Sequence, residues 1–525
     1  MGRTSLLDIS TQAGKNKAET NKAVMDTRPP TLPTPVYPTA QPFAPNSWDQ
    51  RSNRRDIGFA IGAVVLIVAI VAACIAMVHG REALGPSEWD PRVVPLVAFV
   101  EEARGYTFAH PVYVEFLTAE QYRAYATEGS PVSDQERERE REYYRTSARF
   151  FRALGLIGGD VDLAAEQDEI NDSGTLAQYS PANRTVYVRG VEVTASLRLT
   201  LVHELTHALQ DQIFNLNLSR TESDGEAFAL RALAEGDAMR IENEYYATLS
   251  EDEQQQIEDQ SQADQSSSKA LNSDRAPILL ALFGAPYALG GPFVRLLASI
   301  EGELDRAFRS PPTSQENVFD PASFLLDDQP EHVIPAKVPD GATYVGEMGS
   351  EIGVVLWYLL IATHLDQKQA LDAVDGWAGD AMTVYEKDDM LCSTLGFLGD
   401  TETDANEMYR TLTAVAAKLF LDHKPKVANE AREVQLTLCD PGVSAKPPTV
   451  DATTIFARPT VHSLLLGLSL DDPAVTTEQA DCAVDKTIHP LADADMTKLL
   501  QAPSRQDPFL QEVLAHLKAT IATCR

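Results

Sequence analysis

Three residues of this sequence have the types and spacing of a metal centre. His203, Glu204 and His207 form the pattern H-E-x-x-H. On a helix, residues four apart lie on one face, so both imidazoles can bind a single Zn²⁺ ion. Glu204 is turned about 100° from His203 and lies beside the open position of the metal. There it can take a proton from a zinc-bound water, whose pKa the metal lowers to about 7.

The surroundings of the motif predict a helix. Thr194 is a suitable N-cap. Apolar residues repeat at helical spacing after it, at Leu197, Leu201, Leu205 and Ala208. A motif with three fixed positions can arise by chance, but histidines and a glutamate in an apolar stripe are costly unless they have partners. The setting therefore favours a metal site over coincidence.

The third ligand is expected to be a carboxylate. The longer metzincin pattern requires Gly and His at positions occupied here by Gln210 and Ile213. A His₂Glu site with one position left for water is then the default. Glu226 and Glu235 are the candidates, and nine residues on one helix put them on opposite faces, so only one can bind. We favour Glu235, which lies among small apolar residues, over Glu226, which follows a polar run.

Three further residues are candidates for supporting roles. Asp237 can accept the N–H of a ligand histidine, although it can equally be an ordinary surface residue. Tyr287 and Tyr245 are candidates for stabilising an oxyanion, and for both a packed core tyrosine is the favoured alternative.

The chain resembles a group of uncharacterised, largely actinobacterial, membrane-anchored gluzincin-like metallopeptidases. The resemblance covers roughly residues 170–390, and its specific parts are the H-E-L-T-H-A-L-Q-D-Q segment at 203–212 and the E-G-D-A segment at 235–238. The second segment resembles the Glu-Gly-x-Ala segment that carries the third ligand in gluzincin aminopeptidases. The resemblance implies zinc and a hydrolase fold, and it supplies no substrate.

Composition and one apolar run indicate the compartment. The net charge is −33 and the pI is about 4.6, which argues against nucleic acid as a partner. Residues 57–78 are uncharged and long enough to span a bilayer as a helix. Arg51, Arg54 and Arg55 precede this run, so the N-terminus is expected in the cytoplasm and the remainder outside. A lipid-modified Cys74 is a less favoured alternative, and it would also anchor the chain outside.

Four cysteines follow the apolar run, and an even number outside the cytoplasm suggests two disulfides. Three pairings are possible. We predict the sequential one, Cys392–Cys439 and Cys482–Cys524, because each bridge then stays within one region.

The expected architecture is an α+β, mostly helical fold, with a zincin-like ectodomain and a small sheet. Its parts are a disordered tail at 1–56, a membrane helix at 57–78, the metallopeptidase domain at 80–430 and a helical C-terminal subdomain at 431–525. Residues 185–189 read as a strand just before the motif helix. This strand is either an edge that pairs with extended substrate or a core strand.

The sequence thus predicts a membrane-anchored, extracytoplasmic zinc peptidase that acts on peptides or proteins of the cell envelope. Zinc and Glu204 would carry the reaction. Two alternatives remain open, a non-catalytic metal-binding scaffold for envelope partners and a zinc hydrolase of a non-peptide envelope amide. The intact Glu204 argues against the scaffold, because a structural site needs no base.

Overall fold

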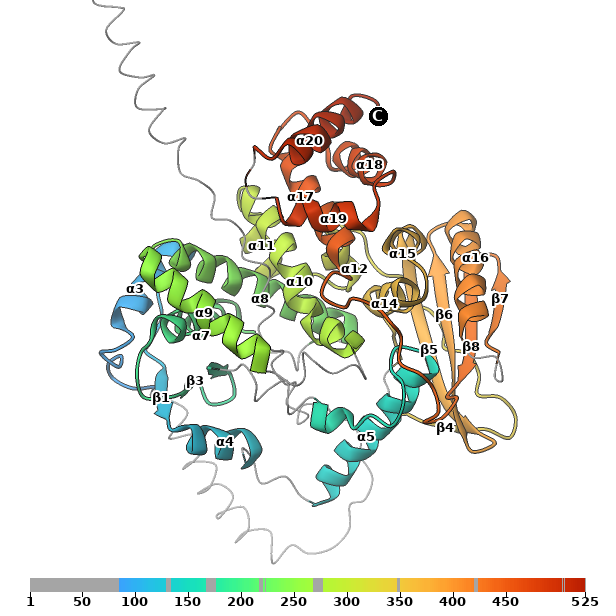
Figure 1. The fold of residues 1–525 in the computed structure, drawn as a ribbon, viewed down its shortest axis with the longest axis horizontal. Coiled ribbons are helices and arrows are strands. Elements are labelled where there is room, and N and C mark those ends of the chain that lie inside the picture. Colours follow the sequence, from blue (N-terminus) through green and yellow to red (C-terminus); the bar gives the residue numbers. More distant parts are fainter. Residues whose placement is uncertain are drawn as a thin grey trace, which may run out of the picture.

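The computed structural model shows a mixed α+β fold in which helices predominate, as expected (Figure 1). It describes residues 85–128, 134–166, 176–216, 221, 223–267, 277–346, 350–419, 424–502, 504 and 506–524. The strands within these ranges form a three-stranded and a five-stranded sheet. The predicted tail at 1–56, the predicted membrane helix at 57–78 and Cys74 lie outside the described residues.

The smaller sheet packs beside the motif helix. Its strands are β1 (Tyr113–Leu117), β2 (Ala177–Ser180) and β3 (Thr185–Arg189), in the order β1-β3-β2. β3 pairs in parallel with β1 and antiparallel with β2, so it has a partner on each side. Of the two roles considered for 185–189, the structure shows the core strand, because β3 has no free edge. Instead, β2 forms the edge next to the motif helix.

Two long helices carry the motif and the candidate third ligands. They are α7 (Ala195–Phe214) and α8 (Asp224–Tyr246). The predicted cap at Thr194 is confirmed, because its hydroxyl accepts the Leu197 amide at 3.1 Å. Ser223 caps α8 in the same way. The helices around this pair are α3 (Val94–Arg104), α4 (Ala119–Glu128), α5 (Asp134–Ala153), α9 (Glu251–Ser267), α10 (Pro277–Ser299) and α11 (Glu303–Arg309).

Helices α8 and α10 cross at two glycines. A Cβ atom added to Gly236 would lie 2.2 Å from the Gly290 carbonyl oxygen, and one added to Gly290 would lie 2.0 Å from the Ala232 carbonyl oxygen. Because only glycine lets the two backbones approach this closely, the crossing fixes the depth at which α10 packs on α8.

The larger sheet lies on the opposite side of the molecule from the three-stranded sheet (Figure 1). Its strands follow the order β4-β5-β6-β8-β7, and every pair is antiparallel. The predicted Cys392–Cys439 disulfide is confirmed and joins directly paired positions of β6 and β8. The strands are β4 (Thr343–Tyr344), β5 (Trp377–Lys387), β6 (Met390–Gly399), β7 (Lys426–Glu430) and β8 (Glu433–Cys439). Nearby helices are α12 (Glu316–Phe319), α13 (Pro321–Leu325), α14 (Val354–His364), α15 (Gln367–Val374) and α16 (Glu402–Lys418).

Four helices form the C-terminal region, α17 (Ala457–Leu470), α18 (Thr477–Ile488), α19 (Asp493–Leu500) and α20 (Pro508–Ile521). The second predicted disulfide, Cys482–Cys524, is also confirmed and joins α18 to the residues after α20. The boundary expected between 430 and 431 falls inside the β7–β8 hairpin, because β8 pairs with β6. The helical region therefore begins at Ala457 and not at 431.

Among the described helices, α10 contains one stretch, Ile278–Ser299, that is long and apolar enough to cross a membrane. Length and composition do not distinguish a membrane span from a core helix. Of its most apolar 18-residue window, 67 % is buried inside the molecule, and the helix packs against α8 and α17. Its packing is that of a core helix.

Candidate metal centre

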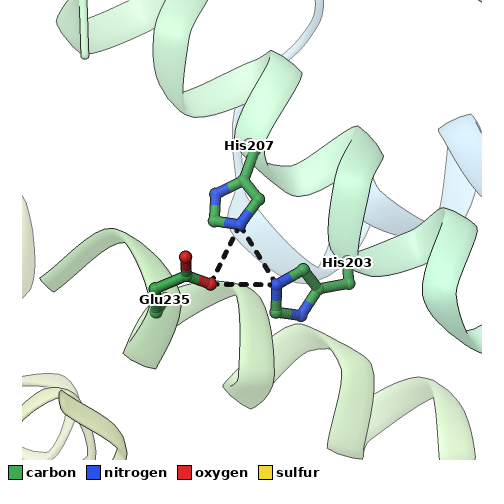
Figure 2. Close-up of side chains that lie close together, drawn as sticks. All are labelled: His203, His207 and Glu235. Atoms are coloured by element: carbon green, nitrogen blue, oxygen red, sulfur yellow. Dashed lines mark hydrogen bonds and ion pairs between the residues drawn. The ribbon is translucent and has the colours of Figure 1, made fainter. Parts of the chain in front are cut away.

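Helices α7 and α8 bring the two histidines of the motif together with Glu235 (Figure 2). His203 Nε2 lies 3.1 Å from Glu235 Oε2 and 3.1 Å from His207 Nε2. His207 Nε2 lies 3.2 Å from the same glutamate oxygen. The three side chains that the sequence suggested as ligands thus converge on one point.

The triangle formed by these three atoms fits a tetrahedral ion. Zinc bonds of about 2.0–2.1 Å to nitrogen and oxygen separate the ligand atoms by about 3.3–3.4 Å in an ideal tetrahedron. The separations here are 3.1–3.2 Å, so a small outward adjustment would suffice. Two imidazoles and one carboxylate are also a donor set that zinc takes in catalytic sites, with the fourth position left for water.

The outer nitrogen of each imidazole has a partner of its own. His203 Nδ1 lies 2.9 Å from Glu242 Oε2, and His207 Nδ1 lies 3.1 Å from Gln210 Oε1. An Nδ1–H that donates to these oxygens leaves each Nε2 lone pair directed at the cluster. Sequence reasoning missed Glu242. Its position two helical turns after Glu235, on the same face of α8, was the signal that could have found it.

The geometry favours Glu235 over Glu226 as the third ligand. Helix α8 is continuous through Gly236, so the two carboxylates leave the helix in different directions. Glu235 is 5 % exposed and faces the histidines. Glu226 lies in the first turn, where its amide bonds to Ser223, and it does not belong to the cluster.

Asp237 reaches the site through a neighbour. Its Oδ2 accepts a hydrogen bond from Gln210 Nε2 at 3.0 Å, and Gln210 in turn holds His207. The same oxygen accepts a bond from Arg104 Nε at 2.8 Å. Asp237 is fully buried, so it is not the surface residue of the alternative prediction. It does not bind a ligand histidine directly but orients the amide that does.

Glu204 is buried beside the ligands and is 2 % exposed. Its Oε2 accepts the backbone amide of Tyr179, on the edge strand β2, at 2.6 Å. Burial raises the pKa of the Glu204 carboxyl, and the nearby His203 and His207 offset part of this effect. The carboxylate predicted to act as a base is therefore held by the strand closest to the motif helix.

The two tyrosines proposed as oxyanion helpers differ in position. Tyr287 is buried, and its hydroxyl donates to Glu235 Oε1 at 3.0 Å, so α10 orients the third ligand. Arg231 Nε lies 3.7 Å from the same oxygen. Tyr245 instead packs edge-on against Phe99, with ring centroids 5.0 Å apart, as the core-tyrosine alternative predicts.

The ionisable groups of the cluster stabilise one another's charged forms. Burial on its own lowers the pKa of His203, but Glu235 and Glu242 outweigh it and raise that pKa well above its ordinary value. Burial would raise the pKa of Glu235, yet His207 and His203 hold it well below its ordinary range. These shifts describe protonated imidazoles paired with the carboxylates, and a metal ion at this point would supply the positive charge in place of those protons.

Neither a family model nor a curated protein nor a solved structure matches the chain. The resemblance to gluzincin-like metallopeptidases therefore stands on the two sequence segments that suggested it.

Proposed function

We propose that the protein is a membrane-anchored, extracytoplasmic zinc peptidase with a zincin-like fold. The observation that carries this proposal is the convergence of His203, His207 and Glu235, with the buried carboxylate of Glu204 beside them. A structural zinc site needs four protein ligands and no base, whereas three ligands and an adjacent carboxylate are typical of a catalytic site.

In this proposal, His203, His207 and Glu235 would hold a zinc ion, which would act as a Lewis acid and lower the pKa of water. Glu204 accepts the proton of the attacking water and delivers it to the amine that leaves. The Tyr179 amide keeps the Glu204 carboxylate in place throughout. Tyr287 and Glu242 hold the ligands Glu235 and His203 in their orientations. Tyr287 thereby acts on the ligand, not on the oxyanion.

Strand β2 supports a peptide substrate. It is an edge of its sheet, and its outward Tyr179 amide already donates to Glu204, so a peptide would pair with the other outward backbone groups of β2. An extended peptide that adds to this edge would bring its backbone carbonyls past the metal centre. We therefore assign the pairing with an extended substrate to β2, and not to residues 185–189.

The compartment is inferred from the two disulfides and from the uncharged run at 57–78. Disulfides persist in oxidising compartments, and the arginines before the run favour a cytoplasmic N-terminus. Substrates would then be peptides or proteins of the cell envelope.

The decisive experiment compares cleaved envelope proteins after treatment with the full-length chain, purified in detergent, or with its Glu204→Gln variant. We expect the variant to bind zinc as well as the wild type and to lose about 10²–10⁴-fold in hydrolysis. Glu244→Gln, a surface carboxylate on α8, is the matched control and should cleave normally. Zinc-loaded wild type without any hydrolytic product would support the scaffold. Products other than peptide fragments would support the amide hydrolase.

A further inference from the structure

A second group of metal-ligand side chains lies where the core meets the C-terminal helices. Asp320 joins α12 to α13, His462 lies on α17, and Asp481 lies on α18. One ligand atom from each residue lies within 4.8 Å of the other two. Asp485, one turn after Asp481, adds another carboxylate. None of these residues takes part in the proposed peptidase site.

The imidazole of this group is buried and directed at carboxylates. The His462 side chain is 7 % exposed, and its Nε2 lies 3.4 Å from Asp481 Oδ1 and 3.1 Å from Asp485 Oδ1. The two aspartates lie on one face of α18 and are 31 % and 47 % exposed. An ion could therefore enter from solvent past the aspartates and reach a nitrogen that is held inside.

Negative charge exceeds positive charge at this junction. A protonated His462 brings one positive charge to the three aspartates around it. A divalent cation would neutralise more of this charge than a proton on His462 can.

We propose that Asp320, His462 and Asp481 form a second metal site that binds a divalent transition-metal ion, Zn²⁺ or Mn²⁺. An imidazole among carboxylates suits these ions, whereas Ca²⁺ prefers six to eight oxygen ligands. Asp485 completes the rim of the site. The bound ion ties α17 and α18 to the α12–α13 segment, so its role is to fasten the C-terminal helices to the core. The site is independent of the chemistry at Glu204.

The test measures metal content and thermal unfolding of the full-length chain in detergent. After saturation with zinc sulfate or manganese chloride and removal of excess ion, we expect about two metal equivalents in the wild type. Asp481→Asn/Asp485→Asn should hold about one equivalent, and so should His203→Ala, which loses the first centre. In the His203→Ala chain, stripped of metal by a chelator, added ion should raise the unfolding temperature, because it binds the folded state. Comparing the zinc and manganese arms identifies the ion.

The control is Asp471→Asn/Asp472→Asn, which removes the same charge from two exposed residues just after α17. It should keep both equivalents. One equivalent in the wild type that His203→Ala abolishes would overturn the second site and leave the proposed peptidase intact. An unfolding temperature of the His203→Ala chain that neither ion raises would show a proton-mediated ion pair in its place. Both measurements use the wild type or His203→Ala, in which Asp320, His462, Asp481 and Asp485 are unchanged. They therefore hold even if the Asp481→Asn/Asp485→Asn variant misfolds.

Discussion

Protein side chains hold the two imidazoles of the first centre at their outer nitrogens. Glu242 holds His203, while Gln210 holds His207 and is itself held by Asp237. Each ring therefore has little freedom to turn. Folding has already fixed the ligand side chains, so metal binding loses little further conformational entropy. The two rings differ in the charge of their partners, since one partner is a carboxylate and the other is a neutral amide.

Removing the carboxylate partner should weaken the site without removing a ligand. We expect Glu242→Ala to lower zinc affinity by about 10- to 100-fold, because His203 loses the acceptor that fixes its tautomer. Glu244→Ala, two residues on and paired with Arg240 on the surface, is the control and should bind as the wild type does. Competition against a fluorescent zinc chelator measures both. Equal affinities would show that Glu242 does not orient His203.

The choice between the two glutamates of α8 can be tested directly. Glu235→Ala should lose most zinc and all hydrolysis, because a His₂ pair alone holds zinc weakly. Glu226→Ala should retain nearly all zinc binding and hydrolysis, because the Glu226 side chain points away from the cluster. Zinc stoichiometry of the two purified variants decides the matter. Loss in Glu226→Ala together with retention in Glu235→Ala would reverse the assignment.

At the scale of elements, the site depends on where α10 crosses α8. The sequence was sufficient to predict the ligands on α7 and α8, because helical spacing and the caps are local signals. It could not predict that Tyr287 donates to Glu235, because that contact depends on a crossing between segments 52 residues apart. The same limit applies to Glu204 on α7, whose backbone partner Tyr179 lies 25 residues earlier, on strand β2.

The crossing predicts opposite effects for two adjacent glycines. Gly290→Ala should destabilise the protein by roughly 1–3 kcal/mol and reduce zinc content, because the new methyl group meets the Ala232 carbonyl and moves Tyr287. Gly291→Ala, whose nearest neighbour is a methionine methyl group at 3.9 Å, should be neutral or stabilising by up to about 1 kcal/mol. Urea denaturation and zinc content of both variants test this. Similar stability of the two would show that the helices can separate freely.

At the scale of the whole molecule, long-range pairings decide the organisation. The change in composition near 430 suggested a boundary, yet β8 returns to pair with β6 and carries the sheet to Cys439. Strand order is not encoded locally, so the sequence could not reveal this pairing. His364, at the end of α14, makes another long-range contact. Its Nε2 lies 3.0 Å from the carbonyl oxygen of Leu154, which is 210 residues away in the sequence.

His364 should make stability depend on pH. Burial, aided by Lys418, lowers its pKa below the ordinary value of 6.5, so folding favours the neutral ring. Its contribution is present above pH 6.5 and is lost as the pH falls, because the unfolded chain then binds the additional proton. We expect the free energy of unfolding to fall more steeply below pH 6.5 in the wild type than in His364→Gln. The exposed His516→Gln is the control. Denaturant titrations at pH 5 to 8 give the slopes, and parallel curves for wild type and His364→Gln would contradict the prediction.

The ligands of the first centre are close neighbours along the chain, since His203 and Glu235 are 32 residues apart. Closing so short a loop costs little chain entropy, and contacts of low sequence separation form early in folding. If the centre binds zinc as proposed, we expect the α7–α8 hairpin to capture it while the five-stranded sheet is still unformed. Loading with metal and acquiring activity would then be separate events in time. Refolding with a zinc-sensitive absorbance probe and an activity assay in parallel should show zinc bound first, and simultaneous onset would contradict this order.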